Sequence, residues 1–236
     1  MTDAIAAMLP ANTMIASGVA YVALIVLVVV CVLSISIVHN RLEEMRFVEQ
    51  KLQANSQKIA NLGSIAGDPK IASTYPKLAE DFGALLDEVR DLNKTVYDLT
   101  YKRLYGDKDA RDNPKRWADR FHANSDTTNL MIIGICACSI AVCSAKLLAA
   151  ATARGQPKPT FLELFSSVTV LDIFLGMLTG LLATFVMKSG SNILSKTSLA
   201  SVDVSNPYGV AFVAAIAGLF MDKFYSWLEP LLTTAK

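Results

Sequence analysis

The feature that most constrains this chain is a long run of uncharged residues near its start. Residues 14–38 contain no Asp, Glu, Lys or Arg over 25 positions. A helix rises 1.5 Å per residue, and about 20 apolar residues cross the hydrocarbon core of a bilayer. A cleaved signal peptide carries a basic n-region, whereas no Lys or Arg precedes Arg41. The run therefore predicts a retained membrane helix.

The charged residues are gathered in one block. Residues 39–128 hold 30 of the 43 charges, 15 basic and 15 acidic, while the other 146 residues hold 13. With 53% hydrophobic and only 18% charged residues, the chain departs from ordinary soluble domains, in which about 25% of residues are charged. With a net charge of +1, the chain lacks the strong positive field expected of a protein that binds duplex nucleic acid. We therefore expect no duplex nucleic acid as a partner.

Three further apolar runs follow the polar block. Residues 130–153 are interrupted only by Lys146 and residues 164–187 only by Asp172, and both runs are long enough to span a bilayer. The run 204–221 is uncharged but shorter. We expect it to cross within about 206–224, with re-entry as the alternative, which leaves the side of the C-terminus open.

These runs predict an all-α integral membrane bundle of three to four spans with a protruding cytoplasmic αα-hairpin. Residues 1–38 form the N-terminal tail and first membrane helix, 39–128 the helical hairpin, and 129–236 the remaining bundle and C-terminal tail. Basic residues lie beside the spans at both ends of the block: Arg41, Arg46, Lys51, Lys115, Arg116 and Arg120. Because such residues favour the cytoplasmic side, we expect a multi-pass inner-membrane protein with a cytoplasmic block.

The polar block has the apolar spacing of two amphipathic helices. From Pro76 the spacing alternates between four and three residues, which is a heptad pattern: Leu78, Phe82, Leu85, Val89, Leu92, Val96 and Leu99. Residues 39–62 are amphipathic too, although Glu49 and Ser56 interrupt the pattern of Leu42, Met45, Val48, Leu52, Ile59 and Leu62. Between them, residues 61–76 have the Gly and Pro content of a turn. We expect the first helix to continue the membrane helix as one rigid rod.

The second and third apolar runs are joined by a turn whose centre predicts a charge pair. Residues 155–159, GQPKP, stop a helix. Lys146 with Asp172, and Arg154 with Glu163, lie almost equidistant from residue 159. Because an ionisable group inside a span normally finds a partner, a cavity or an interface, we expect an ion pair between Lys146 and Asp172. The alternative is that Lys146 extends to the headgroups while Asp172, about 12 Å from the start of its helix at 1.5 Å per residue, lines water in an oligomeric pore.

Small residues indicate where the membrane helices pack closely. The candidate packing residues are Gly176, Gly180, Ala214 and Gly218. The candidate intramembrane polar or pore residues are Asp172, Lys146, Thr179 and Thr184. Asp172, Gly176, Thr179, Ala183 and Met187 share one helix face. This face predicts either a pore lining or a helix interface.

The segment before the second span mixes basic and aromatic residues. Such residues bind anionic headgroups, nucleotides or oligonucleotides, and the ligand-binding candidates are Lys102, Arg103, Lys115, Arg116, Trp117 and Arg120. The alternative is ordinary positive flanking of a span, with Trp117 at the membrane interface. A cytosolic regulatory protein is a further possible partner of this block.

Catalytic and metal-binding patterns are missing from the sequence. There is no phosphate loop, nucleophile elbow or paired-carboxylate motif. Cys31, Cys136, Cys138 and Cys143 all lie in apolar runs, where a thiol is usually a small buried hydrophobe. We therefore expect no enzyme activity, no cofactor and no metal site.

Two resemblances bear on function. One N-terminal helix, a helical block of about 90 residues and a close pair of membrane helices are similar to the TolQ/ExbB type of ion-driven motor subunit. The ending 211–232, with Gly218, Leu219, Phe220, Asp222, Lys223 and Phe224, resembles small bacterial multi-pass membrane effectors of anti-phage defence, such as channel subunits of Hailong- or Kiwa-type systems. The second resemblance implies a homo-oligomeric channel, a tetramer by preference, that opens on infection and depolarises the cell.

Three functions follow as hypotheses. The first, which we favour, is a gated oligomeric membrane channel acting as a depolarising effector in bacterial anti-phage defence. The second is a motor subunit of the TolQ/ExbB type. The third is a structural membrane scaffold that conducts no ions.

Overall fold

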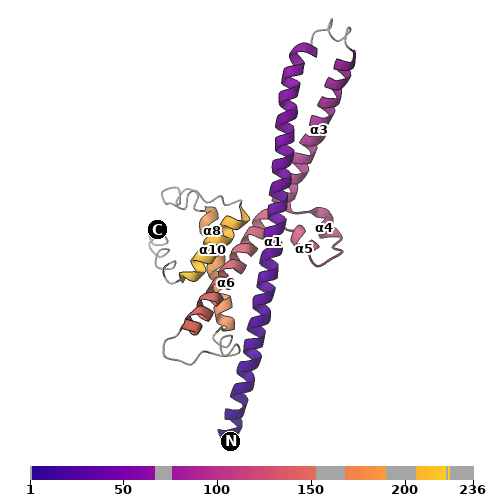
Figure 1. Cartoon of the computed structure of the whole chain (residues 1–236). Coiled ribbons are helices and arrows are strands. Elements are labelled where there is room, and N and C mark those ends of the chain that lie inside the picture. Colours follow the sequence, from indigo (N-terminus) through magenta and orange to yellow (C-terminus); the bar gives the residue numbers. More distant parts are fainter. Residues whose placement is uncertain (1, 67–75, 153–167, 190–205, 222, 224–236) are drawn as a thin grey trace, which may run out of the picture. The chain divides into compact units, whose positions relative to one another are not determined.

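The structure, a computed structural model, describes residues 2–66, 76–152, 168–189, 206–221 and 223. Within these ranges it is helical, with short irregular links and without strands, as the sequence predicts for the fold class. The helices shown in Figure 1 are α1 (Thr2–Ala66), α3 (Pro76–Tyr105), α4 (Lys108–Asp112), α5 (Asp119–His122), α6 (Asp126–Thr152), α8 (Val170–Ser189) and α10 (Pro207–Leu219).

The chain divides into two units. The apolar unit comprises Met1–Val38 and Thr128–Lys236, and the polar unit comprises His39–Thr127. Helices α1 and α6 each have residues in both units.

Among the described residues, three helices are long and apolar enough to cross a membrane: Gly18–Leu62 within α1, Asp126–Thr152, and Val170–Met187 within α8. Helix α10 has 13 residues and ends at Leu219, before the predicted limit of 224. At 1.5 Å per residue it is about 20 Å long, shorter than the roughly 30 Å of a bilayer core. Its crossing of the membrane stays a prediction.

Helix α1 is unbroken over 65 residues. Residues 19–62 contain neither Gly nor Pro, the residues that most disfavour a helix interior. The prediction that the helix of residues 14–38 continues into the polar block is therefore confirmed, and its crossing of a membrane stays a prediction.

The buried face of α1 follows a heptad spacing. Buried or half-buried residues alternate at intervals of four and three: Ala20, Leu24, Leu27, Cys31, Ser34, Val38, Arg41, Met45, Val48, Leu52, Asn55, Ile59 and Leu62. The predicted interruption at Glu49 and Ser56 is wrong, because both are exposed and Val48 and Asn55 occupy the buried face. The face is continuous but includes the polar residues Arg41 and Asn55. The side-chain nitrogen of Asn55 is buried without a hydrogen-bond partner.

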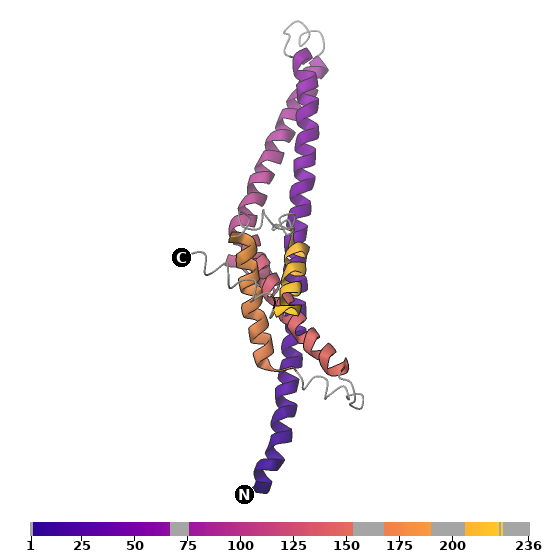
Figure 2. The same ribbon diagram turned by 90° about the vertical axis from the view of Figure 1, so that its left-hand side faces the viewer.

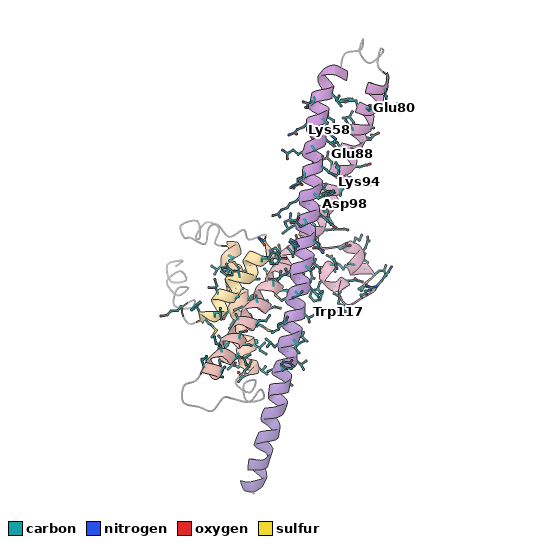
Figure 3. All side chains as sticks on the ribbon, in the orientation of Figure 1. Lys58, Glu80, Glu88, Lys94, Asp98 and Trp117 are labelled. Atoms are coloured by element: carbon teal, nitrogen blue, oxygen red, sulfur yellow. The ribbon has the colours of Figure 1, made fainter. Side chains whose placement is uncertain are left out.

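In the polar unit, α3 packs against α1. Met45 and Val48 of α1 form a buried cluster with Leu99 of α3, and Leu92 and Val96 pack against it. Figures 1 and 2 both show the two helices side by side. Many charged side chains of this unit are exposed, including five that Figure 3 labels: Lys58, Glu80, Glu88, Lys94 and Asp98.

In the apolar unit, glycines bring the helices into backbone contact. A Cβ on Gly176 of α8 would lie 2.6 Å from Cα of Ser139 in α6, and one on Gly218 of α10 would lie 2.6 Å from the Cys138 carbonyl oxygen. A Cβ on Gly180 would overlap the Gly134 carbonyl oxygen. Ala214 of α10 is fully buried. Side chains at these positions would separate α6 from α8 and α10, which explains why small residues occur there.

Candidate functional site

A buried charge network joins three helices of the polar unit. Arg41 of α1 lies with Nη1 2.9 Å from Oδ1 of Asp126, and Arg103 of α3 donates from Nε to Oδ2 of the same carboxylate at 2.9 Å. Asp126 is the first residue of α6. We call Arg41, Arg103 and Asp126 the Arg41 clamp. It ties the start of α6 to both α1 and α3.

Backbone carbonyls complete the surroundings of Arg41. Nη1 also donates to the Asn124 carbonyl oxygen at 3.0 Å, and Nη2 donates to that of His122 at 2.5 Å. Only 6% of Arg41 is exposed. A guanidinium offers five N–H donors in a planar fork, which suits several acceptors at once. Because desolvated charges are costly when unpaired, removing one partner of such a network is strongly destabilising.

The loop that carries the acceptor carbonyls is held in a defined conformation. Gly106 ends α3 with a φ of 82°, a backbone conformation that glycine adopts without strain. A Cβ there would overlap the carbonyl of Ala123. The N–H of Asp107 then donates to the His122 carbonyl oxygen at 3.0 Å. Gly106 thus lets the end of α3 approach the segment that binds Arg41.

Asp107 caps the short helix α4. Its carboxylate accepts hydrogen bonds from the N–H groups of Asp109 and Ala110, and its Oδ2 lies 3.2 Å from Nζ of Lys102. Burial alone would raise the pKa of Asp107, but the hydrogen bond and charge of Lys102 and the two N–H donors outweigh burial. The pKa of Asp107 therefore lies below its ordinary value.

The predicted ligand-binding residues fall into two groups. Lys102 and Arg103 are engaged with carboxylates of this chain, Asp107 and Asp126. Lys115, Arg116, Trp117 and Arg120 are exposed. Trp117, 60% exposed, makes an edge-to-face contact with Phe121 at a centroid distance of 5.7 Å. The structure therefore brings together only part of the predicted set.

A cavity of about 640 Å³ lies beside this exposed group. It is lined by three carboxylates and one lysine, together with uncharged residues: Asp109, Asp112, Asp119, Lys115, Ala110, Asn113 and Pro114. Asp119 already accepts hydrogen bonds from the N–H groups of Lys115 and Arg116. An excess of negative charge does not suit a nucleotide or oligonucleotide, so this cavity does not support that interpretation.

In the apolar unit, the two charged residues that hairpin symmetry paired are in contact. Nζ of Lys146 in α6 lies 2.6 Å from Oδ1 of Asp172 in α8. The Asp172 side chain is 6% exposed, whereas that of Lys146 is 50% exposed. The pair therefore links α6 to α8 and leaves much of the lysine accessible.

Asp172 lies at a helix end and not in the middle of its span. Helix α8 starts at Val170, so Asp172 is in the first turn, where the helix dipole favours a negative charge. Its Oδ2 accepts from N–H and Oγ1 of Thr169 at 2.9 and 2.8 Å. The sequence Thr169-x-x-Asp172 is the capping pattern that indicates this start. The prediction that placed Asp172 well inside its helix was wrong because this pattern was not recognised.

The polar face of α8 is buried inside the chain. Asp172, Gly176, Thr179, Ala183 and Met187 are all buried. The hydroxyls of Thr179 and Thr184 donate to the carbonyls of Leu175 and Gly180 at 2.8 Å each. On α6, Ser139 donates to the Ile173 carbonyl oxygen across the helix interface at 3.2 Å. Within the described part of the chain, this face forms a helix interface, and its lining of a pore in an oligomer stays a prediction.

Some predictions lie outside the described residues. They concern Arg154 and Glu163 in the turn between α6 and α8, and Asp222 and Phe224 in the C-terminal segment.

The Arg41 clamp was missed by sequence reasoning, which used Arg41 only as a basic flank of the first span. Arg41 lies on the same heptad face as Val38 and Met45, and an arginine on a buried face requires an acidic partner. That spacing was the available signal. The partner, 85 residues away, had no signal of comparable strength.

No protein-family model matches the chain, and comparison with curated proteins and with solved structures found no similar protein.

Proposed function

We propose that this chain is a subunit of a homo-oligomeric, gated membrane channel whose polar unit receives the opening signal. In this proposal α1, α6 and α8 cross the bacterial inner membrane, α10 packs with them, and the polar unit forms a cytoplasmic αα-hairpin. A tetramer is the preferred assembly.

The observation that carries this proposal is the Arg41 clamp. Asp126 starts the apolar helix α6, and its carboxylate is held by arginines from both long helices of the polar unit. A displacement of α3 relative to α1 must therefore break or move the attachment of α6. In this proposal the network changes between discrete arrangements when the gate opens, as packed interfaces do in switching proteins.

Burial of the polar face of α8 is consistent with a closed arrangement. The buried hydroxyls and Asp172 would become available to water only if α6 and α8 separated. Intramembrane polar groups of this kind are typical of ion pathways. The apolar side chains exposed on α8 and α10, including Phe174, Phe185 and Phe212, are suited to lipid or to neighbouring subunits.

The role in anti-phage defence is the part of the proposal that rests on the resemblance of residues 211–232. This role predicts that cells that express the chain depolarise on phage infection and that cells without the chain do not. The membrane potential is measured with a potential-sensitive dye. Depolarisation that is equal in both strains would remove the defence role.

A second candidate function is a non-conducting membrane scaffold. The close packing of Gly176 against Ser139, at 2.6 Å for a hypothetical Cβ, favours it because a permanent helix interface needs no opening. The two candidates differ in ion flux: a channel conducts ions when it is open, whereas a scaffold conducts none in any variant.

A further inference from the structure

The apolar unit contains a cavity lined in part by lysines, which has no role in the proposed channel. It has a volume of about 290 Å³ and lies between α6 and the end of α10. Its lining is mainly apolar with two lysines: Val142, Ala145, Lys146, Gly218, Leu219, Phe220, Met221 and Lys223.

The charge in this cavity is positive. Lys146 contributes one ammonium group, and the described residue Lys223 contributes another and is exposed. Asp172 offsets part of this charge through its 2.6 Å contact with Lys146. Its other oxygen is occupied by Thr169, so the carboxylate is satisfied inside the chain. An ammonium group has three N–H donors, and half of the Lys146 side chain remains accessible.

The cavity lies at the ends of the helices that form it. Lys146 is six residues before the end of α6, and Phe220 is the residue that caps α10. Asp172, the partner of Lys146, is in the first turn of α8. In a helix bundle that crosses a bilayer, the helix ends lie at the depth of the lipid headgroups. In the proposed function, in which α6 and α8 cross the bilayer, the cavity therefore combines cations with apolar walls at headgroup depth; this step rests on that proposed arrangement.

We infer that this cavity binds the phosphate group of an anionic glycerophospholipid, with Lys146 and Lys223 as the phosphate ligands. Basic residues beside membrane helices attract such headgroups electrostatically. The exposed side chains of Leu219 and Phe220 offer an apolar surface along which an acyl chain lies. The inference goes beyond the proposed channel and does not depend on conduction.

The test uses the full chain purified in a mild detergent, with bound lipid measured by native mass spectrometry. Three probes are compared: phosphatidylglycerol, diacylglycerol with the same acyl chains, and inorganic phosphate. We expect phosphatidylglycerol to bind and diacylglycerol not to bind. Inorganic phosphate should compete poorly, because it lacks the acyl chains that contact the apolar walls.

Two variants separate the cavity from general attraction to positive charge. Lys223→Gln should weaken phosphatidylglycerol binding about tenfold, since it removes one charge-assisted contact. Ala145→Phe should abolish binding by filling the cavity while keeping both lysines. The matched control is Lys94→Gln, which removes an exposed lysine of the polar unit and should bind as the wild type does.

Several results would overturn the inference. Equal binding of diacylglycerol would show that the lysines do not select the lipid. Full competition by inorganic phosphate would make free phosphate the ligand instead of a lipid. Wild-type binding of phosphatidylglycerol by Lys223→Gln would also overturn the inference. This variant alters only an exposed side chain, so it should fold as the wild type does. Binding is measured without ion flux, so failure here leaves the proposed channel intact, and the reverse also holds.

Discussion

Arg41 donates hydrogen bonds to three acceptors in the polar unit. It is buried, it is charged, and its acceptors come from residues 122–126. Arg46, five residues further along α1, makes an exposed ion pair with Glu43 at 3.0 Å. The two arginines therefore provide a natural comparison between buried and exposed charge on one helix.

Arg41→Ala should lower the free energy of unfolding of the chain by about 3–5 kcal/mol, because Asp126 would lose its buried partner. Arg46→Ala should change it by less than about 1 kcal/mol, since exposed pairs contribute little. Denaturant-induced unfolding of the detergent-solubilised chain, followed by circular dichroism, measures both. Equal losses in the two variants would argue against the clamp.

Asp107 should make α4 sensitive to acid. Its pKa is lowered in the folded chain, so the stability it contributes is present above its unfolded pKa of about 3.9 and is lost as the pH falls through the folded value. The amide hydrogens of residues 108–112 should therefore exchange faster, relative to their intrinsic unprotected rate at each pH, in that acidic range. In Asp107→Asn, exchange should already be faster at neutral pH and should not show this acid-dependent increase. A wild-type acid response in that variant would assign the effect to another group.

At the scale of helices, glycine positions determine how closely the apolar unit packs. Gly176 faces the backbone of Ser139, while Gly83 on α3 faces open space, with nothing within 4 Å of a hypothetical Cβ. The same substitution at the two sites therefore isolates the effect of the helix interface.

Gly176→Ala should destabilise the chain by about 1–3 kcal/mol, the usual cost of overpacking a close contact. Gly83→Ala should stabilise it by up to about 1 kcal/mol, because alanine favours a helix interior more than glycine does. Thermal melting of the two purified variants against the wild type gives the comparison. A Gly176→Ala variant that melts like Gly83→Ala would mean that α6 and α8 do not pack as described.

Some elements could be predicted from the sequence because their signal is local. The alternating spacing that ends at Val96 and Leu99 places these residues in the cluster with Met45. The partner of Lys146 followed from symmetry about a turn. The interruptions of the buried face of α1 at Glu49 and Ser56 were wrongly predicted because an apolar pattern omits Arg41 and Asn55, although both are buried.

Other features depend on contacts between distant residues. Asp126 binds Arg41 from 85 positions away, and the loop geometry that allows this contact depends on Gly106 and the carbonyl of His122. No periodicity links these positions. The burial of Thr179 and Thr184 was also beyond the sequence, because a polar helix face has the same pattern whether it lines water or packs against another helix.

At the scale of the whole molecule, two helices carry residues of both units, and one buried network of the polar unit holds the start of α6. If this network controls the opening of a channel, substitution of its carboxylate, Asp126, should change the open probability. Asp126→Asn weakens both arginine contacts without removing the side chain, whereas Asp98→Asn alters an exposed carboxylate of α3.

The most direct test is the current through planar bilayers that contain the purified chain. We predict ion currents with a higher open probability for Asp126→Asn than for the wild type, and wild-type behaviour for Asp98→Asn. Absence of current from both the wild type and a folded Asp126→Asn variant, at every applied voltage, would contradict the channel and leave the scaffold.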